Sequence, residues 1–243
     1  MLNNALYDEI FRRKSIRAYQ SAPLTRETIA LAQKCINSAV PLIPSEHAEL
    51  QFVQSKDEGI RRVNSYCADS LIGRVNLGYM LEQIHLSLSL NGIASLWWGM
   101  AREPGDIAPP DGLRFAIALK VGLAQDTLHR SITEFDRVPI EEIVDDAPLQ
   151  SVFEPLRLAP SAMNSQPWYA TREKGQIKVF CAKPGVLKKI FVAKMNQLDI
   201  GIAVCHIVLA LEHENIQINA VHPLEDTNAP KGYYPVLALE TSL

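Results

Sequence analysis

The sequence has few of the features that would place a protein in a specialised class. Its four cysteines are widely separated and form no C-x-x-C pair, so neither a zinc site nor a disulfide framework is indicated. We predict no metal site and four reduced thiols, at Cys35, Cys67, Cys181 and Cys205. The longest apolar runs, 93–101 and 202–211, are well short of the ~18 residues that suggest a membrane span.

Charge of one sign is not in excess either. The chain has 24 basic and 27 acidic residues and a formal net charge of -3, without a basic stripe, so nucleic acid is not an expected partner. Residues 1–14 have no uninterrupted apolar core and do not resemble a secretion signal. Together with reduced thiols and an ordinary 47% of hydrophobic residues, these features predict a cytoplasmic globular enzyme.

Common catalytic motifs are missing as well. No G-x-G-x-x-G follows a predicted strand, so a parallel dinucleotide-binding sheet lacks its main support. No G-x-S-x-G surrounds Ser161, so we predict no hydrolase triad. His85 and His206 lie in apolar helical stretches, where a hydrogen-bonded core histidine is expected rather than a ligand.

The chain does contain the same order of elements twice. Each half has a helix, a polar loop, a strand, a long apolar helix and a further strand. Helices are predicted over 4–13, from the N-cap Thr25 to about 39, and over 71–92, 148–159 and 198–215. Strands are predicted over 50–54, 114–122, 168–173, 176–182 and 233–241. No flexible linker separates the halves, so we expect one compact unit over 1–243, with a first half at 1–137 and a second half at 138–243 related by pseudo-twofold symmetry.

The first candidate binding segment is "RRKSIRAY" at 12–19. Extended backbone would turn Arg13, Ser15 and Arg17 to one face, with Lys14 between them. Arginine forks and a hydroxyl suit a phosphate group. The alternative is a basic turn in solvent.

The second candidate is "APSAMNSQPW" at 159–168. In an extended loop Asn164 and Gln166 would face the same way, and their amide groups would match a ring edge of alternating carbonyl and N–H groups. Pro160 and Pro167 would stiffen this loop, and Trp168 would anchor it in the core. The alternative is a helix stop followed by an aromatic plug.

A third candidate is "GIASLWWGM" at 92–100. Gly99 permits close approach of a ligand to the backbone, while Trp97 and Trp98 would supply one core ring and one ring facing the site. A buried turn with aromatic packing is the alternative. Arg137, in "FDRVPIEEIV", is a candidate that indicates almost nothing by itself.

Together these segments resemble the FMN-dependent nitroreductase family. "FRRKSIRAY" and "LAPSAMNSQPW" resemble its two signatures, residues 77–100 its central helix and following loop, and "DRVPIEEIV" its tail. The family's typical protein is a homodimer in which the two motifs reach one flavin from different subunits. Here the loop expected near 40–50 lacks Asn, Gln and Trp, and the second half lacks the basic cluster. The resemblance therefore implies an α+β nitroreductase fold in which one chain forms a fused pseudo-dimer with one FMN site.

The resemblance also implies the site residues and the chemistry. The flavin contacts it implies are Arg13, Lys14, Ser15, Arg17, Trp98, Gly99, Arg137, Pro160, Ser161, Ala162, Asn164 and Gln166. Electrons would pass from NAD(P)H through flavin N5 to a nitroaromatic, quinone or similar acceptor, with no side chain required as acid or base. Two alternatives are a flavin-binding or cofactor-free protein that is not an enzyme, and a flavin-processing enzyme. A monomer is expected, with a homodimer left open.

Overall fold

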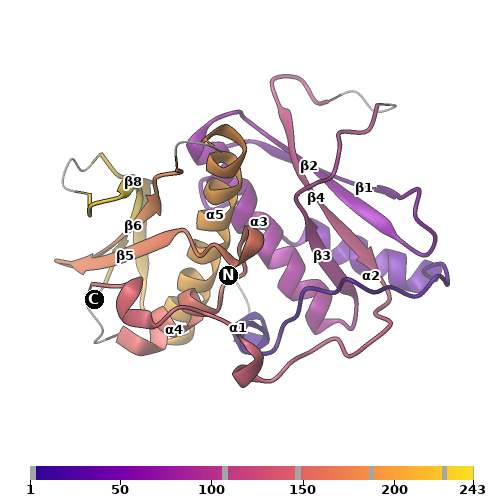
Figure 1. The fold of residues 1–243 in the computed structure, drawn as a ribbon, viewed down its shortest axis with the longest axis horizontal. Coiled ribbons are helices and arrows are strands. Elements are labelled where there is room, and N and C mark those ends of the chain that lie inside the picture. The colour runs from indigo at the N-terminus through magenta and orange to yellow at the C-terminus, as the bar shows by residue number, and fades with distance from the viewer. Residues whose placement is uncertain (1–3, 106–108, 146–148, 186–188, 226–228, 243) are drawn as a thin grey trace.

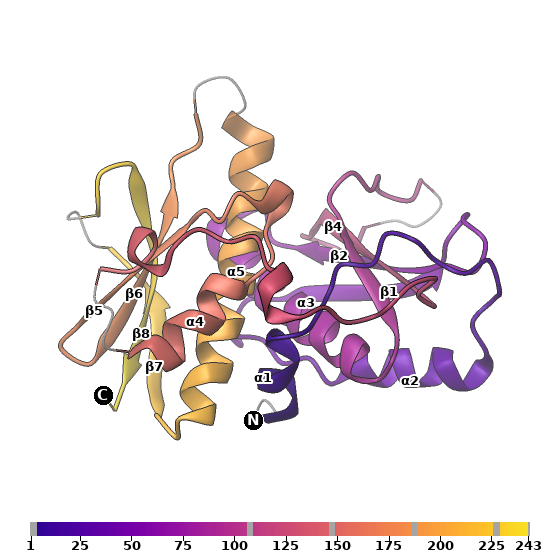
Figure 2. The same cartoon turned by 60° about the horizontal axis from the view of Figure 1, so that its bottom comes forward.

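Two four-stranded antiparallel sheets lie on opposite sides of a central pair of helices (Figures 1 and 2). The computed structural model describes residues 4–105, 109–145, 149–185, 189–225 and 229–242. The first sheet has the order β1-β2-β4-β3, with β1 at Ala48–Gln54, β2 at Arg61–Cys67, β3 at Ala94–Trp98 and β4 at Arg114–Gly122. The second has the order β5-β6-β8-β7, with β5 at Trp168–Glu173, β6 at Gln176–Ala182, β7 at Ile218–Pro223 and β8 at Tyr233–Thr241.

The central helices are α3 (Leu71–Leu90) and α5 (Lys189–His213). The shorter helices α1 (Asn4–Ile10), α2 (Arg26–Asn37) and α4 (Gln150–Leu158) pack around them. The predicted N-cap is confirmed, because the Thr25 hydroxyl accepts a hydrogen bond from the Thr28 N–H. Gly92 adopts φ +76° directly after α3, a left-handed conformation that terminates the helix there.

The two halves repeat the same topology. Both sheets place the strand that follows the central helix at one edge, beside the last strand of that half. Each sheet is also interrupted by an irregularity at the corresponding pairing, between Ser65 and Tyr66 in β2 and between Val179 and Phe180 in β6. The prediction of an α+β fold built from two similar halves is confirmed.

Two glycines allow α3 and α5 to cross at close range. A Cβ atom on Gly78 would lie 2.1 Å from the carbonyl oxygen of Leu198, and one on Gly201 would lie 2.1 Å from that of Val75. No side chain fits at such distances, so backbone packs directly against backbone at both positions. The repeated glycine fixes the contact between the halves.

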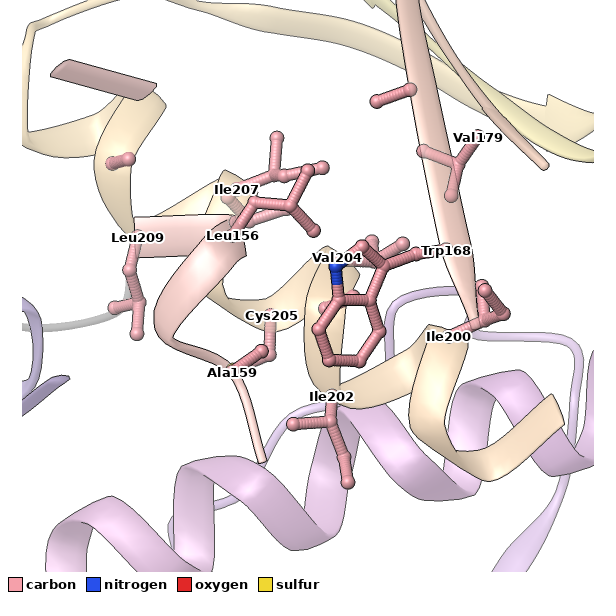
Figure 3. Packing of buried hydrophobic residues seen from close by; sticks show 14 of the residues in the cluster. Leu156, Ala159, Trp168, Val179, Ile200, Ile202, Val204, Cys205, Ile207 and Leu209 are labelled. Atoms are coloured by element: carbon pink, nitrogen blue, oxygen red, sulfur yellow. The ribbon is translucent and has the colours of Figure 1, made fainter. Parts of the chain in front are cut away.

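The buried side chains form two hydrophobic clusters, one for each sheet. The second cluster is the one that packs against the second sheet. Trp168, fully buried as predicted, lies in it beside Ile200 and Val204 of α5 (Figure 3). Leu6 and Ile10 of α1 belong to this second cluster, although they come from the start of the chain. The N-terminal helix therefore ties the first residues of the sequence to the second sheet.

Sequence periodicity locates most elements but misses three strands. The predicted strands 114–122, 168–173, 176–182 and 233–241 match β4, β5, β6 and β8, while β2, β3 and β7 were not predicted. Polar residues interrupt the hydrophobic alternation of β2 and β7, and the glycines flanking β3 made 92–100 resemble a turn. The first helix ends at Ile10 rather than 13, and α5 starts at Lys189 rather than 198.

Among the described residues, one helix, over Val192–His213, is long and apolar enough to cross a membrane, and 78% of its most apolar window is buried inside the protein. It is the α5 core helix between the two sheets (Figure 2). Its own buried hydrophobic residues belong to both hydrophobic clusters, Met195 and Leu198 to one and those from Ile200 to Leu211 to the other, which accounts for its apolar composition.

Candidate functional site

The basic segment, residues 12–19, runs between the edge strand β3 of the first sheet and residues 123–137. The N–H of Ile16 donates to the carbonyl of Ser95 at 3.1 Å, and the N–H of Arg130 donates to the carbonyl of Arg12 at 2.9 Å. Arg13 is 1% exposed, whereas Arg17 is exposed to solvent. The cations of this segment are therefore held at a boundary between core and solvent.

The loop of the second half is not extended, so that prediction is wrong. Residues Ala162–Asn164 form a single 3₁₀ turn, and Met163, Asn164 and Gln166 have φ values of 54°, 56° and 46°. Left-handed backbone is strained for residues with a Cβ atom, and such strain is concentrated at functional sites. Here side-chain hydrogen bonds hold the strained turn in place.

Asn164 and Gln166 tie this loop to the segment around Arg137. The Asn164 Oδ1 accepts from Arg137 Nη1 at 2.7 Å, and its Nδ2 donates to the carbonyl of Asp136 at 3.0 Å. The Gln166 Oε1 accepts from the N–H of Val138 at 3.0 Å. Both side-chain amides therefore hold the loop against residues 136–138 through hydrogen bonds.

The two segments meet at a cavity of about 430 Å³. Predicted residues from both halves line it: Arg13, Lys14, Ser15, Arg17, Arg137, Pro160, Ser161 and Asn164. The sequence did not point to the other lining residues, which are Arg130, Glu134, Asp136 and Met163. Met163 lies within the 159–168 motif but was not singled out there, whereas Arg130 stands in no recognised motif and only the fold brings it here. Trp98, Gly99, Ala162 and Gln166 do not line this cavity.

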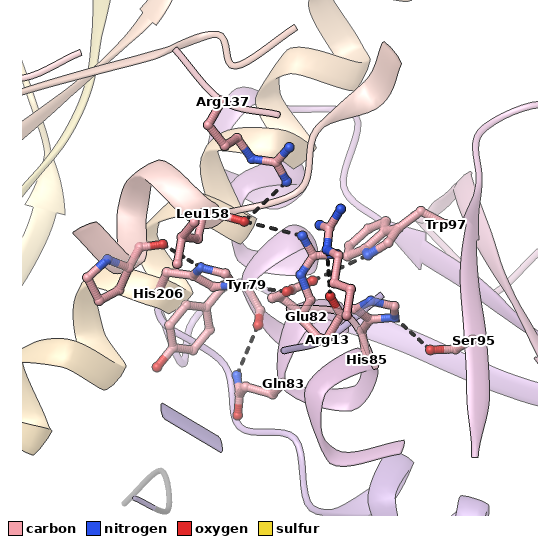
Figure 4. Close-up of polar contacts among 12 residues, drawn as sticks. Arg13, Tyr79, Glu82, Gln83, His85, Ser95, Trp97, Arg137, Leu158 and His206 are labelled. Atoms are coloured by element: carbon pink, nitrogen blue, oxygen red, sulfur yellow. Dashed lines mark hydrogen bonds and ion pairs between the residues drawn. The ribbon is translucent and has the colours of Figure 1, made fainter. Parts of the chain in front are cut away.

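A buried arginine, Arg13, and a half-buried one, Arg137, bridge the halves beside the cavity. Arg13 Nη2 and Arg137 Nη2 each donate to the carbonyl oxygen of Leu158 at 3.2 Å (Figure 4). Leu158 is the last residue of α4, where carbonyl groups carry the negative end of the helix dipole. The end of α4 therefore attracts one cation from each motif of the site.

The arginines crowd around one aromatic ring. The guanidinium carbons of Arg130, Arg137 and Arg13 lie 3.7, 5.6 and 5.7 Å from the centre of the Phe135 ring. Burial, and then the neighbouring cations Arg130 and Arg137, lower the pKa of Arg13 to about 9, against the opposing effect of Glu82. Burial and Arg130 also lower the pKa of Arg137 to about 10. Cations that destabilise one another in this way favour an anionic ligand.

Ala162 serves the loop through its backbone. Its N–H donates to both carboxylate oxygens of Asp199 on α5, at 3.1 Å each. The equivalent residue of α3, Asn76, accepts from the N–H of Ile43 at 3.0 Å. Each central helix therefore holds the loop of its own half from the same position, two residues before the crossing glycine. Burial raises the pKa of Asp199 to about 8.

The two tryptophans point in opposite directions from β3. Trp97 Nε1 donates inward to Glu82 Oε2 at 3.3 Å (Figure 4). Trp98 lies on the outer face of the sheet, with Lys120 Nζ 4.3 Å from the centre of its ring. Trp97 is thus the core ring of the pair, and the Trp98 ring faces away from the core. Gly99 lines a second, smaller cavity.

Both helical histidines are buried and hydrogen-bonded, as predicted. His85 Nδ1 lies 2.6 Å from Ser95 Oγ, and His206 Nδ1 lies 2.7 Å from the carbonyl oxygen of Pro155 (Figure 4). Burial lowers the pKa of His85 to about 4, so it is neutral at pH 7. Neither ring lines the cavity, so these side chains belong to the interior between the halves.

Comparison with known proteins identifies the family. A family model described as "Putative TM nitroreductase" matches residues 5–211. The chain belongs to this nitroreductase family. Nitroreductases are oxidoreductases, so the predicted family and the predicted enzyme class are both confirmed. No curated protein matched the sequence.

Two solved structures are similar to the chain to different extents. A structure from Thermotoga maritima, described as a putative nitroreductase, has 18% identity and a TM-score of 0.70, covering 97% of this chain and 93% of its own. A Desulfitobacterium hafniense nitroreductase with bound FMN has 14% identity and a TM-score of 0.44, covering 57% of this chain and 100% of its own. The Thermotoga structure shows the same fold along nearly the whole of this nitroreductase.

Proposed function

We propose that this nitroreductase is an FMN-dependent oxidoreductase that passes electrons from NAD(P)H to a nitroaromatic, quinone or similar acceptor. One observation carries the proposal: the basic segment at 13–17 and the loop at 160–164 line a single cavity, although they come from different halves. One chain thereby supplies both motifs. A single shared site also explains why each half has kept one motif and lost the other.

The chemistry of the lining side chains fits the phosphate end of FMN. Positive charge is in excess among the described residues that line the cavity. The two acidic residues there, Glu134 and Asp136, face five basic ones: Arg13, Lys14, Arg17, Arg130 and Arg137. Glu134 is moreover engaged by the N–H of Ser131 at 2.7 Å. The excess positive charge and the Ser15 hydroxyl suit a phosphate dianion.

The other half would bind the remainder of the cofactor. We assign Pro160, Ser161 and Asn164 to direct contact, because they line the cavity. Ala162 and Gln166 act through the loop geometry, since their hydrogen bonds hold the strained turn. Trp98 and Gly99 are assigned no direct contact with the phosphate end, because they lie outside this cavity.

FMN held by these residues would supply the redox chemistry between reduced nicotinamide and the acceptor. The protein's own residues bind and orient the cofactor and stabilise charge. Arg17, exposed at the edge of the cavity, provides a cation that favours the negatively charged, reduced form. No side chain of the chain needs to transfer a proton as acid or base.

The absorbance spectrum of the purified protein, before and after titration with FMN, tests this function. We expect one FMN per chain, identified after heat release, and oxidation of NADH or NADPH in the presence of a quinone. Two flavins per chain would contradict the shared site. Failure to bind added FMN would overturn the proposal in favour of a cofactor-free role.

A further inference from the structure

The second cavity has a volume of about 250 Å³ and is also built from both halves. Its wall is formed by Cys67, Ala68, Asp69, Arg74, Gly99, Ala101, Arg114, Phe115, Ala116, Lys194, Met195 and Leu198. Ala162, from the loop of the first cavity, packs in the same hydrophobic cluster as Met195 and Leu198. The second cavity therefore lies close to the proposed flavin loop.

Positive charge is in excess at this cavity. Arg74 and Lys194 both bond to Oδ1 of Asp69, so one carboxylate serves two cations. These hydrogen bonds, first from Lys194 and then from Arg74, lower the pKa of Asp69, which is therefore ionised at neutral pH.

Arg114 adds a third cation. Its Nη1 donates to the carbonyl of Leu113 at 3.3 Å, and within the described part of the chain no carboxylate pairs with it. Its side chain is exposed at the cavity edge, so it can turn toward a ligand without breaking an ion pair. Arg74, by contrast, is fixed by Asp69 and by Gln197 Oε1 at 2.5 Å.

The rest of the wall is largely apolar. Met195, Leu198, Phe115 and Ala116 provide an apolar surface beneath the cations. A cavity of this volume is slightly smaller than the roughly 300–1,000 Å³ of sites for drug-sized ligands. It therefore suits a single ring bearing one anionic group rather than a whole dinucleotide.

We infer that the second cavity binds the electron acceptor and selects a monocyclic aromatic compound that carries a carboxylate, with Arg114 as the residue that determines this charge preference. This inference rests on the proposed function. For a nitrobenzoate, the two-electron step balances as nitroarene plus NAD(P)H plus H⁺ giving nitrosoarene, NAD(P)⁺ and water. The carboxylate takes no part in that step and serves only in binding.

A pair of acceptors that differ only in charge tests the inference. We would compare kcat/KM for 4-nitrobenzoate and for its neutral methyl ester, using the FMN-loaded protein, its Arg114→Gln variant and the control Arg26→Gln. Arg26 is exposed and lines neither cavity. The ratio of acid to ester should fall about threefold to fivefold in Arg114→Gln, as for loss of one exposed charge pair, and stay constant in Arg26→Gln.

A binding measurement separates this inference from the proposed function. Calorimetric titration with benzoate, which is not reduced, should show binding that weakens by a similar factor in Arg114→Gln and at higher salt. An unchanged acid-to-ester ratio together with unchanged benzoate binding would overturn the inference. A raised KM for NAD(P)H with unchanged benzoate binding would instead assign Arg114 to the phosphate of the donor. Absence of bound FMN would overturn the proposed function and with it the acceptor role, while benzoate binding that weakens in Arg114→Gln would still show that the cavity takes an aromatic carboxylate, because benzoate binding needs no turnover.

Discussion

His206 Nε2 lies 3.0 Å from Glu82 Oε1, and both side chains are completely buried where α3 and α5 meet. The other ring nitrogen, Nδ1, faces the carbonyl of Pro155, which can only accept a hydrogen bond. The His206 ring therefore links Glu82 of α3 to Pro155 of α4. This buried pair joins the first half of the chain to the second inside the core.

Removing one member of this pair should destabilise the fold strongly. In His206→Leu the Glu82 carboxylate would stay buried, and of the donors drawn in Figure 4 it would keep the Trp97 N–H alone. Breaking a buried pair in this way costs about 3–5 kcal/mol, measurable by urea unfolding. The matched control is His222→Leu, which breaks the half-exposed pair with Glu240 and should cost less than about 1 kcal/mol. Equal losses in the two variants would contradict the role of the buried pair.

The close helix crossing predicts a second stability effect. Gly201→Ala would place a methyl group 2.1 Å from the Val75 carbonyl oxygen, so α5 and α3 would have to separate. Overpacking of this kind costs about 1–3 kcal/mol and at times more. Gly185→Ala, where a Cβ meets nothing within 4 Å, serves as the control in thermal or urea unfolding. The idea fails if Gly201→Ala is as stable as the wild-type protein.

The proposed cofactor site predicts a loss of FMN affinity without a loss of stability. Arg17 is exposed and makes no contact that the core needs. Arg17→Gln should weaken FMN binding about tenfold, the scale of one charge-assisted hydrogen bond, and slow flavin reduction by NAD(P)H. Fluorescence titration with FMN measures the affinity. Arg26→Gln should bind FMN like the wild type, and an unchanged Kd for Arg17→Gln would remove Arg17 from the site.

Asp199 predicts a pH effect on stability. Burial raises its pKa from 3.8 to about 8 in the folded protein. Between these values the folded chain holds a proton that the unfolded chain has released, so the contribution of Asp199 to stability is lost as the pH rises through about 8. The slope is at most about 1.4 kcal/mol per pH unit.

Asp199→Asn should remove this slope while keeping the loop in place, because an amide oxygen can still accept from the Ala162 N–H, as Asn76 accepts in the other half. The free energy of unfolding of the variant, relative to wild type, should therefore increase from pH 5 to pH 8. The exposed Asp111→Asn variant is the control. A constant difference across that range would show that Asp199 does not titrate there.

The sequence alone determined the elements and their repetition. Four strands were located to the residue because apolar and β-branched side chains recur locally at the period of a buried strand. The likeness of residues 71–92 to 198–215 predicted two similar halves, and the resemblance to the nitroreductase family implied that the motifs at 12–19 and 159–168 serve one site. These features depend on neighbouring residues and survive without knowledge of the fold.

Only the tertiary structure decided which side chains meet. The left-handed turn at 163–164, the outward direction of Trp98 and the arrival of Arg130 beside Phe135 all follow from contacts between distant segments. The direct backbone contact at Gly78 and Gly201 likewise sets where the basic segment of one half faces the loop of the other. Long-range packing and buried charge override local preference at such places, so the sequence indicated part of the cavity lining but not its geometry.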